Sequence, residues 1–165
     1  MGDDECMKKR TGKVFIMFLM TVLLFAVPGF SAYAENHSYD GKSPYYNNCA
    51  SSATTKVYTN LLNGNNEKFG KVELKFSSTC KTAWAKITLD KPAASDWNAN
   101  AWIKRNTDGK QLSCDSSGGN GRVLAGQTSC YTPMVYDLDP RSSYAFGKYY
   151  NLKTGAYTYA YTSSY

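Results

Sequence analysis

Apolar and polar positions alternate with a period of two along much of the chain, which is typical of strands that bury one face. Val72, Leu74 and Phe76 alternate with charged residues, and residues 83–89 place Ala, Ile and Leu at every second position. We predict strands wherever this alternation, or a run of β-branched and aromatic residues, occurs. The predicted strands are residues 50–61, 72–76, 83–89, 102–105, 111–114, 123–125, 129–136, 144–150 and 156–161.

Turn signals separate these strands. Residues 63–66 are rich in Asn and Gly, residues 118–121 form a Gly-rich loop, and Asp108-Gly109 predicts a tight hairpin turn of type I′. About eight short antiparallel strands at this spacing predict an all-β fold, either a sandwich or a small closed barrel. No internal linker divides residues 35–165, so we expect a single domain there.

Residues 1–34 follow a different pattern. A basic start at residues 7–13 precedes an apolar run, residues 14–27, that is shorter than the roughly 18 to 20 residues needed to span a bilayer. A basic start followed by a short apolar run is typical of a signal peptide. The alternative, an uncleaved anchor helix, is disfavoured by the same length argument.

The end of this segment predicts where it is cut. Ala32 and Ala34 are small residues at the two positions that a signal peptidase requires, so we expect cleavage after Ala34. Three acidic residues precede Met7 and oppose a positive start, which makes Met7 the expected true beginning. The predicted product is a secreted, extracellular domain, residues 35–165, with no membrane attachment after cleavage.

The composition of residues 35–165 suggests that this domain needs disulfide bonds to be stable. Val, Ile, Leu, Met and Phe supply only 18 of the 131 residues from 35 onward, whereas Tyr supplies 13 and Trp three. So few aliphatic residues put burial of enough apolar surface at risk, and we expect a thin core completed by aromatic rings.

Cysteine usage is consistent with such support. Cys49, Cys80, Cys114 and Cys130 are an even number in an exported domain, which predicts two disulfides with three possible pairings. The preferred pairing joins Cys49 to Cys80 and Cys114 to Cys130, because each pair brackets one predicted hairpin. Zinc is disfavoured because there is no Cys-x-x-Cys pair and His37 is the only histidine. No metal or other cofactor is expected.

Catalytic residues are not recognisable. A serine or cysteine mechanism needs a base beside its nucleophile, but the four cysteines are expected to be paired and His37, near the start of the domain, is the only histidine. Most Asp residues lie in turn signals, where their side chains stabilise the turn. Asp137 and Asp139 are too few for a calcium site, and the Gly-rich loop with Arg122 lacks the context of a nucleotide site. We therefore predict a protein that is not an enzyme. The alternative is a small hydrolase that uses two carboxylates.

Several segments resemble the YjfA-like family of small secreted proteins from Gram-positive bacteria, a family built on domain of unknown function 2690. The resemblance rests on residues 40–44 ahead of Cys49, on residues 78–87 with the element Cys80-x-x-x-Trp84-Ala-x-Ile, and on residues 131–135. It covers most of residues 35–165. It implies an extracellular, disulfide-linked β domain and implies no reaction, cofactor or catalytic residue.

Net charge favours anionic partners. The chain carries a formal charge of +6, and basic residues gather at Lys68, Lys71 and Lys75 and again around Lys104, Arg105 and Lys110. Such clusters attract anionic polymers, although lysines on strand edges also serve only to discourage aggregation. No nucleic-acid motif is present, so no nucleic acid is expected. The expected partner is a polysaccharide or an anionic wall polymer, with an extracellular protein as the alternative.

Aromatic side chains are the candidate binding residues. Tyr157, Tyr159 and Tyr161 share one face of the last predicted strand, and Tyr149 and Tyr150 lie on the strand before it. Exposed, this row would stack against sugar rings; buried, it would fill the core, and the sequence leaves both open. Trp97 and Trp102 have the same ambiguity.

These expectations combine into a predicted function. We predict a secreted, cationic, non-enzymatic protein that binds polysaccharide through its Tyr and Trp surfaces. The alternative is an extracellular inhibitor or growth-inhibiting protein.

Overall fold

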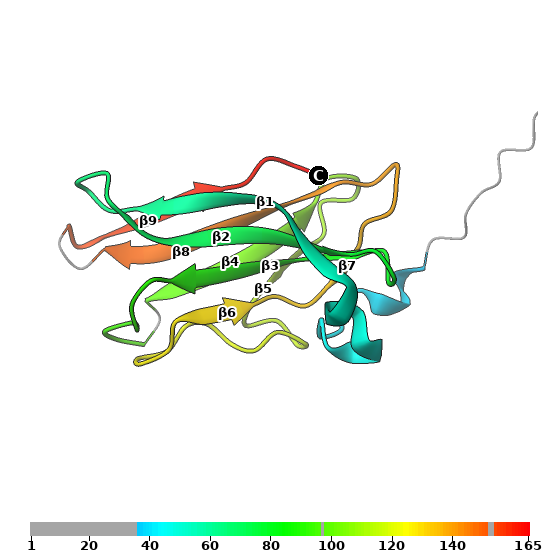
Figure 1. Ribbon diagram of the computed structural model, residues 1–165, viewed down its shortest axis with the longest axis horizontal. Coiled ribbons are helices and arrows are strands. Elements are labelled where there is room, and N and C mark those ends of the chain that lie inside the picture. Colours follow the sequence, from blue (N-terminus) through cyan, green and yellow to red (C-terminus); the bar gives the residue numbers. More distant parts are fainter. Residues whose placement is uncertain (1–35, 97, 152–153) are drawn as a thin grey trace, which may run out of the picture. The chain divides into compact units, whose positions relative to one another are not determined.

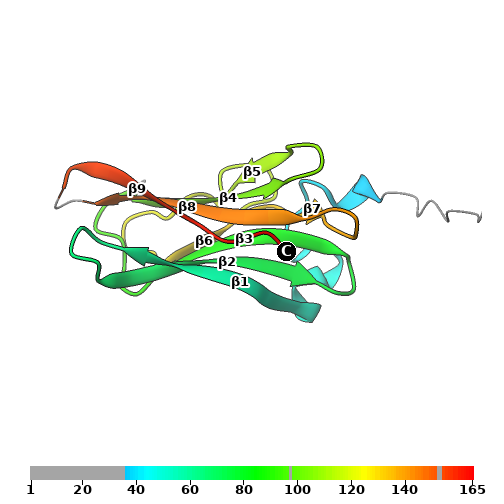
Figure 2. The same cartoon turned by 90° about the horizontal axis from the view of Figure 1, so that it is seen from above.

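The computed structural model describes residues 36–96, 98–151 and 154–165. The predicted signal peptide and Trp97 lie outside the described residues. The described chain forms two antiparallel sheets that stack face to face, as Figures 1 and 2 show from two directions. The sheets do not close into a barrel, so the all-β prediction is confirmed in its sandwich form.

The first sheet is built around one long hairpin. It has the strand order β1-β2-β3-β6, and a short strand, β7, also pairs with β3. Its strands are β1 (Ala53–Leu62), β2 (Lys68–Ser77), β3 (Thr82–Leu89), β6 (Ser129–Tyr131) and β7 (Val135–Tyr136). Two 3-10 helices precede it, η1 (His37–Tyr39) and η2 (Tyr46–Ser52).

The second sheet has the strand order β5-β4-β8-β9. Its strands are β4 (Ala99–Arg105), β5 (Gln111–Ser113), β8 (Ser143–Asn151) and β9 (Ala156–Tyr161). β8 pairs with β4 on one side and with β9 on the other along most of its length. The sheet therefore presents an outer surface that is continuous across β4, β8 and β9.

Three predicted elements differ from the structure. The predicted strand at residues 129–136 is interrupted around Pro133, which has no backbone N–H to donate to a ladder. Of residues 123–125, only Val123 pairs, in an isolated bridge to Ala99. The Asp108-Gly109 turn is not of type I′, because only Gly109 has a positive φ; the Asp108 carboxylate instead accepts hydrogen bonds from Arg105.

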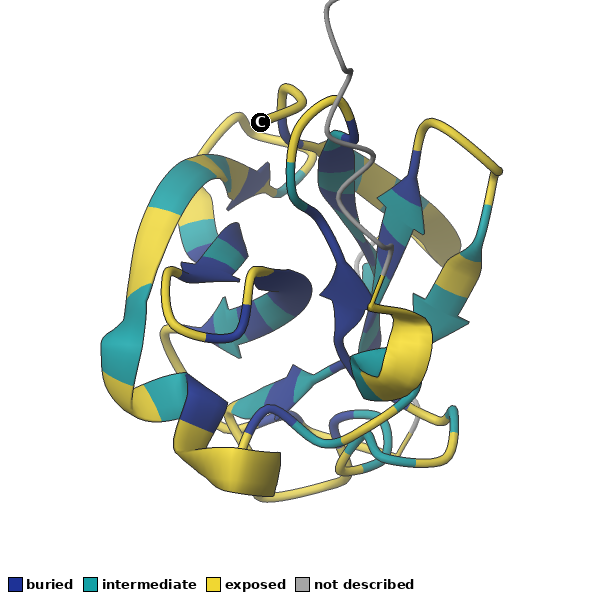
Figure 3. Cartoon of the chain, turned by 90° about the vertical axis from the view of Figure 1, so that its right-hand side faces the viewer, coloured by how far each residue is buried: buried dark blue, intermediate teal, exposed yellow. Residues whose placement is uncertain are grey.

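The core between the sheets is mainly aliphatic, and aromatic rings complete it less than predicted, through Phe76 and Tyr149. Its buried side chains are Leu61, Val72, Leu74, Phe76, Ala83, Ala85, Ile87, Leu89, Ala93, Ala99, Ala101, Ile103, Cys114, Val123, Cys130, Val135, Ala145 and Tyr149. The first sheet supplies most of the large residues, whereas the second sheet supplies mainly alanines. Figure 3 shows the resulting alternation as bands of dark blue and teal along the strands.

Gly147 on β8 explains why the second sheet is small on its inner side. A Cβ atom at this position would lie 2.3 Å from Val72 Cγ2 and 3.0 Å from Ile87 Cδ1. The side chains of the first sheet thus reach almost to the β8 backbone. Bulk on β8 must consequently point outward.

The disulfides have the preferred pairing. Cys49 is bonded to Cys80, which fastens η2 to the turn after β2. Cys114 is bonded to Cys130, which joins the loop after β5 to β6 and therefore links the two sheets. Both pairs are buried.

Candidate functional site: an aromatic face on the second sheet

The outer side of β8 carries large side chains at every second position. Tyr144, Phe146, Lys148 and Tyr150 alternate with the buried or inward residues of the same strand, as a period of two requires. Since the inner side of β8 is occupied by small residues against the first sheet, these four side chains lie on the outer surface.

A row of stacked rings crosses three strands. Phe146 is directly opposite Trp102 on β4 and Tyr161 on β9. The ring centroids of Trp102 and Phe146 are 5.2 Å apart with an interplanar angle of 6°, and those of Phe146 and Tyr161 are 5.3 Å apart at 22°. These are the offset-stacked distances that aromatic pairs prefer. The three rings form one flat strip.

A second group of rings adjoins this strip along β9. Lys148 is opposite Tyr159, and Tyr150 is opposite Tyr157, with Tyr150 and Tyr157 centroids 5.1 Å apart. The Lys148 ammonium lies 3.8 Å from the Tyr157 centroid and 5.8 Å from that of Tyr159, a cation–π arrangement. Tyr159 stacks beside Tyr161 at 6.5 Å.

We call this surface the aromatic face. It consists of Trp102, Tyr144, Phe146, Tyr150, Tyr157, Tyr159 and Tyr161, with Lys148 among them. Tyr157, Tyr159 and Tyr161 are 49%, 49% and 56% exposed, so their rings and hydroxyls are open to a ligand. Because its exposed rings are contiguous, the aromatic face is the candidate interaction site.

Polar groups border the aromatic face on the β4 side. Asn100 lies next to Lys148 across the sheet, and its Nδ2 donates to Asp115 Oδ2 at 2.6 Å. Arg122 Nε donates to the other oxygen of Asp115 at 2.8 Å. The amide of Asn100 is therefore held in a fixed orientation at the margin of the rings.

The structure places most of the predicted binding residues on the aromatic face but buries one of them in the core. Tyr157, Tyr159, Tyr161 and Trp102 come together on the aromatic face. Tyr149 does not: it is 3% exposed, its ring packs 4.3 Å from that of Phe69, and its hydroxyl donates to the carbonyl of Leu62. The prediction that Tyr149 lies beside the β9 tyrosines was wrong because odd-numbered residues of β8 face the core.

Two members of the aromatic face, Tyr144 and Phe146, were not among the predicted site residues. Tyr144, Phe146 and Tyr150 occupy the even positions of β8. The signal was present in the alternation of residues 144–150, where small residues at 145 and 147 separate the large ones. Once the small side of a strand is recognised as the core side, the outward set follows.

The predicted cationic cluster around Arg105 is wrong. Arg105 is 1% exposed, and its guanidinium forms a bidentate pair with Asp40 at 3.0 and 3.1 Å and another with Asp108 at 2.6 and 2.9 Å. Lys110 also pairs with Asp40, at 3.2 Å. These charges neutralise one another and fasten the N-terminal segment to the β4–β5 hairpin.

Ionisation of the Asp40 carboxylate is favoured by this network. Burial alone would raise its pKa, but hydrogen bonds from Arg105, the backbone N–H of Tyr136 and His37 outweigh burial, so the pKa of Asp40 lies below its ordinary value. The hydrogen bond from Arg105 likewise lowers the pKa of Asp108. The network therefore persists as an ionic structure at neutral pH.

Carboxylates elsewhere do not form an evident acid–base pair. Glu67 and Asp90 line a cavity of about 440 Å³ at the end of the sandwich, but Glu67 accepts a hydrogen bond from Asn63 at 2.8 Å and Asp90 pairs with Lys68 at 3.7 Å. Asp137 is buried and accepts from Ser143 Oγ at 2.7 Å, whereas Asp139 is exposed. The two therefore do not share one surface as a calcium pair would.

The described ranges hold neither a metal-ligand cluster nor a membrane-spanning helix. Residues 36–96, 98–151 and 154–165 contain no group of three or more His, Cys, Asp or Glu side chains arranged to hold a metal ion. Among the same residues, no helix has the length and apolar character needed to cross a bilayer.

Comparison with known proteins identifies the family. A model for proteins of unknown function, DUF2690, matches residues 37–146. The chain is 63% identical over 143 residues to the uncharacterized protein YjfA of Bacillus subtilis (strain 168), an alignment that covers 87% of this chain and 91% of that protein. No solved structure matches the chain. The chain therefore belongs to the YjfA-like DUF2690 family, as its motifs around Cys80 and Trp84 predicted.

Proposed function

We propose that this protein is a non-catalytic binding protein that holds polysaccharide against its aromatic face. The observation that carries the proposal is the strip formed by Trp102, Phe146 and Tyr161, whose rings are stacked across three strands. Tyr161 is exposed, and Trp102 and Phe146 are half-buried. Sugar rings pack their C–H surfaces on aromatic rings, and the neighbouring tyrosine hydroxyls supply hydrogen bonds.

The arrangement of the strip suits an extended ligand. The rings lie on paired strands of one sheet, and strands in a sheet are about 4.7–4.9 Å apart, so they follow a line across the sheet. A rigid sheet also presents the rings with little loss of side-chain freedom, because each ring is already stacked on its neighbour. Binding therefore costs less conformational entropy than it would on a loop.

We further propose that the protein works outside the cell. Two disulfides indicate an oxidising compartment. Polysaccharide of the envelope or of the surroundings is the abundant polymer there, and the signal peptide predicted at residues 1–34 would deliver the domain to it.

Retention on insoluble polysaccharide tests this function. Purified protein is mixed with chitin, cellulose and bacterial wall material, and the bound fraction is compared with that of Tyr159→Ala and of a Tyr159→Ala/Tyr161→Ala double variant. We expect each substitution to weaken retention several-fold, because each ring contributes on the order of 0.5–1.5 kcal/mol.

Tyr58→Ala is the matched control. Tyr58 is 65% exposed but lies on β1 of the other sheet. It should bind as the unchanged protein does. Equal retention of all four proteins, or no retention by any of them, would show that the aromatic face does not bind polysaccharide; binding of a secreted protein instead would favour the inhibitor alternative.

A further inference from the structure

A pocket of about 260 Å³ lies on the opposite side of the sandwich from the aromatic face, between η2 and the outer surface of the first sheet. Half of its lining residues are aromatic or basic, namely Tyr45, Lys75, Trp84, Lys86 and Tyr131, and Asn120 lies among them. The proposed function does not use any of these residues. The pocket also contains Trp84, which belongs to the most specific family motif.

Strand register brings the basic and aromatic groups together. On β3, Trp84 and Lys86 point away from the core, because Ala83, Ala85 and Ile87 point into it. Lys75 on β2 is directly opposite Trp84, and Tyr131 on β6 is directly opposite Lys86. Directly opposed side chains have Cβ atoms about 4.5–5.5 Å apart, so two lysines and two rings border one small area. The Lys75 ammonium already donates one hydrogen bond, to Thr55 Oγ1 at 2.9 Å, and keeps its other N–H groups for a ligand.

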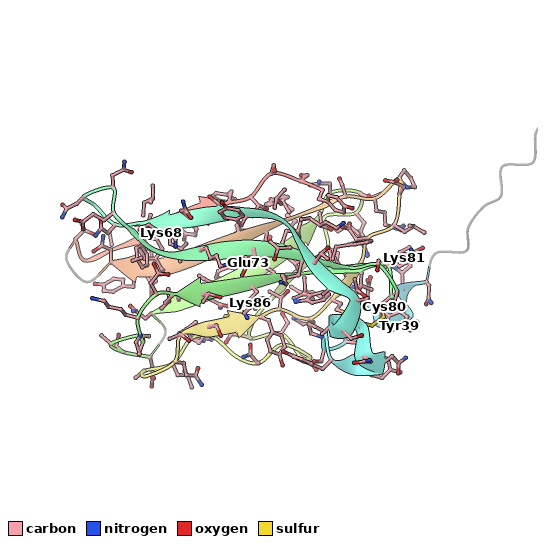
Figure 4. The ribbon with its side chains drawn as sticks, viewed as in Figure 1. Tyr39, Lys68, Glu73, Cys80, Lys81 and Lys86 are labelled. Atoms are coloured by element: carbon pink, nitrogen blue, oxygen red, sulfur yellow. A yellow bond between two sulfur atoms is a disulfide. The ribbon has the colours of Figure 1, made fainter. Side chains whose placement is uncertain are left out.

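The floor of the pocket is rigid. Trp84 is only 4% exposed because it packs with Met134 and the Cys49–Cys80 disulfide. Figure 4 shows Cys80 at the η2 end of the sheet and Lys86 further along β3. Tyr45 forms a wall, with its ring 5.4 Å from that of Tyr131 in an edge-to-face arrangement.

The lining contains no carboxylate, and its charge is positive. The nearest acid on this face, Glu73, is opposite Lys86 and is visible beside it in Figure 4. Its carboxylate is engaged elsewhere, by Thr55 Oγ1 at 2.9 Å and by Lys71 Nζ at 3.2 Å. Within the described part of the chain, Lys86 has no ion-pair partner.

Further hydrogen-bond donors face the pocket. Asn120 Oδ1 accepts from the backbone N–H of Tyr131 at 2.7 Å, which leaves the amide NH₂ as a donor. Together with the two ammonium groups, this gives a lining rich in donors. Such a lining fits a ligand that carries a negative charge and several acceptor oxygens.

We propose that this pocket binds an acidic sugar, specifically a uronate unit of an anionic polysaccharide, with its carboxylate on Lys75 and Lys86 and its ring against Tyr45 and Tyr131. The Tyr45 and Tyr131 rings favour a sugar acid over a small inorganic anion, because an inorganic anion has no apolar surface to pack against them. The volume is below the roughly 300–1,000 Å³ of sites for larger ligands, so it suits one sugar unit. This site is independent of the aromatic face in position and in ligand chemistry.

The test compares soluble polymers of different charge. Affinity electrophoresis or calorimetry at low salt measures binding of polygalacturonate, of neutral dextran and of poly(glycerol phosphate) to the unchanged protein. We expect polygalacturonate to bind, to bind more weakly as salt rises, and to bind at least tenfold more tightly than the other two polymers.

Variants locate the binding. Lys86→Gln should weaken polygalacturonate binding about tenfold, because a hydrogen bond to a charged group is lost, and Tyr45→Ala should weaken it several-fold. Lys91→Gln is the matched control: it removes the same charge from an exposed position just after the C-terminal end of β3, outside the pocket lining, and should bind as the unchanged protein does. Tyr159→Ala should also leave this binding intact, which separates the pocket from the aromatic face.

Three results would overturn the proposal. Equal binding of polygalacturonate and dextran would exclude recognition of the carboxylate. Equal weakening by Lys86→Gln and Lys91→Gln would show a general charge effect in place of a pocket. Tighter binding of poly(glycerol phosphate) than of polygalacturonate would identify a phosphate polymer as the ligand.

Discussion

Arg105 shows how a single basic residue in this cationic chain serves structure and not recognition. Its guanidinium is shared between Asp40 and Asp108 and also donates to the carbonyl of Tyr136 at 2.9 Å. Asp40 in turn accepts from the backbone N–H of Tyr136 at 2.6 Å. A residue near the N-terminus, a hairpin and β7 are therefore joined by one guanidinium, and the charge is hidden from any ligand.

Removal of the Asp40 charge should destabilise the fold. We expect Asp40→Asn to lower the free energy of unfolding by about 3 kcal/mol, because it leaves a buried guanidinium with one carboxylate instead of two. Urea denaturation measures the change. Asp90→Asn is the control, since Asp90 pairs with Lys68 at the surface, and it should change stability by less than about 0.5 kcal/mol. Equal effects of the two substitutions would show that the buried pair contributes no more than a surface pair.

The two sides of β8 carry side chains of different size: mainly small ones pack in the core, and large ones form part of the aromatic face. Its inner side is Ser143, Ala145, Gly147 and Tyr149, and its outer side is almost entirely aromatic. The large side chains that fill the space between the sheets come mainly from the first sheet. The inward side chains of β8 that face Val72 and Ile87 therefore have to be small. The same requirement leaves the aromatic rings on the outside.

The requirement for a residue without a side chain at Gly147 can be tested. Gly147→Ala should lower the free energy of unfolding by about 1–3 kcal/mol, because the new methyl group would overlap the stiff, β-branched side chain of Val72. Thermal or urea unfolding measures this. Gly64→Ala is the control in an exposed turn, where the nearest atom would be Thr154 Cγ2 at 3.4 Å. No loss of stability in Gly147→Ala would mean that the sheets can move apart freely.

The sequence predicted the strands better than it predicted which side of each strand is buried. Alternation placed Tyr157, Tyr159 and Tyr161 on one face, and the structure agrees. It left the direction of that face open, because direction depends on the bulk supplied by the opposite sheet. Val72 and Ile87 decide it, and they are far from β8 in sequence. For the same reason the sequence did not show whether Tyr149 faces the core or the surface, and the pocket above Trp84 was not foreseen.

At the scale of the whole domain, two groups of carboxylates impose opposite dependences on pH. The pKa values of Asp40 and Glu73 are lowered: burial opposes this in each, but hydrogen bonds, first from Arg105 and from Thr55 respectively, prevail. These groups stabilise the fold above about pH 4 and lose that contribution as the pH falls further. Burial raises the pKa of Asp137 to about 6, against the hydrogen bond from Ser143.

Stability should therefore be greatest near pH 4. Between about pH 4 and pH 6 the folded state holds a proton on Asp137 that the unfolded chain releases, so stability falls as the pH rises across that interval. The loss is on the order of 2–3 kcal/mol. Melting temperatures recorded from pH 3 to pH 8 measure it, and Asp137→Asn should abolish the decline above about pH 4. A melting temperature that keeps rising to pH 7 would contradict this assignment.

The Cys114–Cys130 disulfide, which links the two sheets, should contribute to the free energy of unfolding of the whole domain. Replacement of both Cys114 and Cys130 by alanine frees a connection of 16 residues and should cost about 3 kcal/mol of stability. Replacement of Cys49 and Cys80 should cost a similar amount and should also loosen η2 above Trp84, which weakens the pocket. Denaturation of each double variant with and without reductant compares the two. A domain that unfolds at the same urea concentration when fully reduced would refute both expectations.

The outward placement of bulk on β8 and β9 has a consequence for how readily these positions accept substitution. Since the rings of the aromatic face take almost no part in holding the two sheets together, exchanges among Tyr, Trp, Phe and polar residues at those sites should carry little penalty in folding. A library randomised at positions 157, 159 and 161 should therefore yield mostly well-folded members, even where the proposed ligand is no longer held.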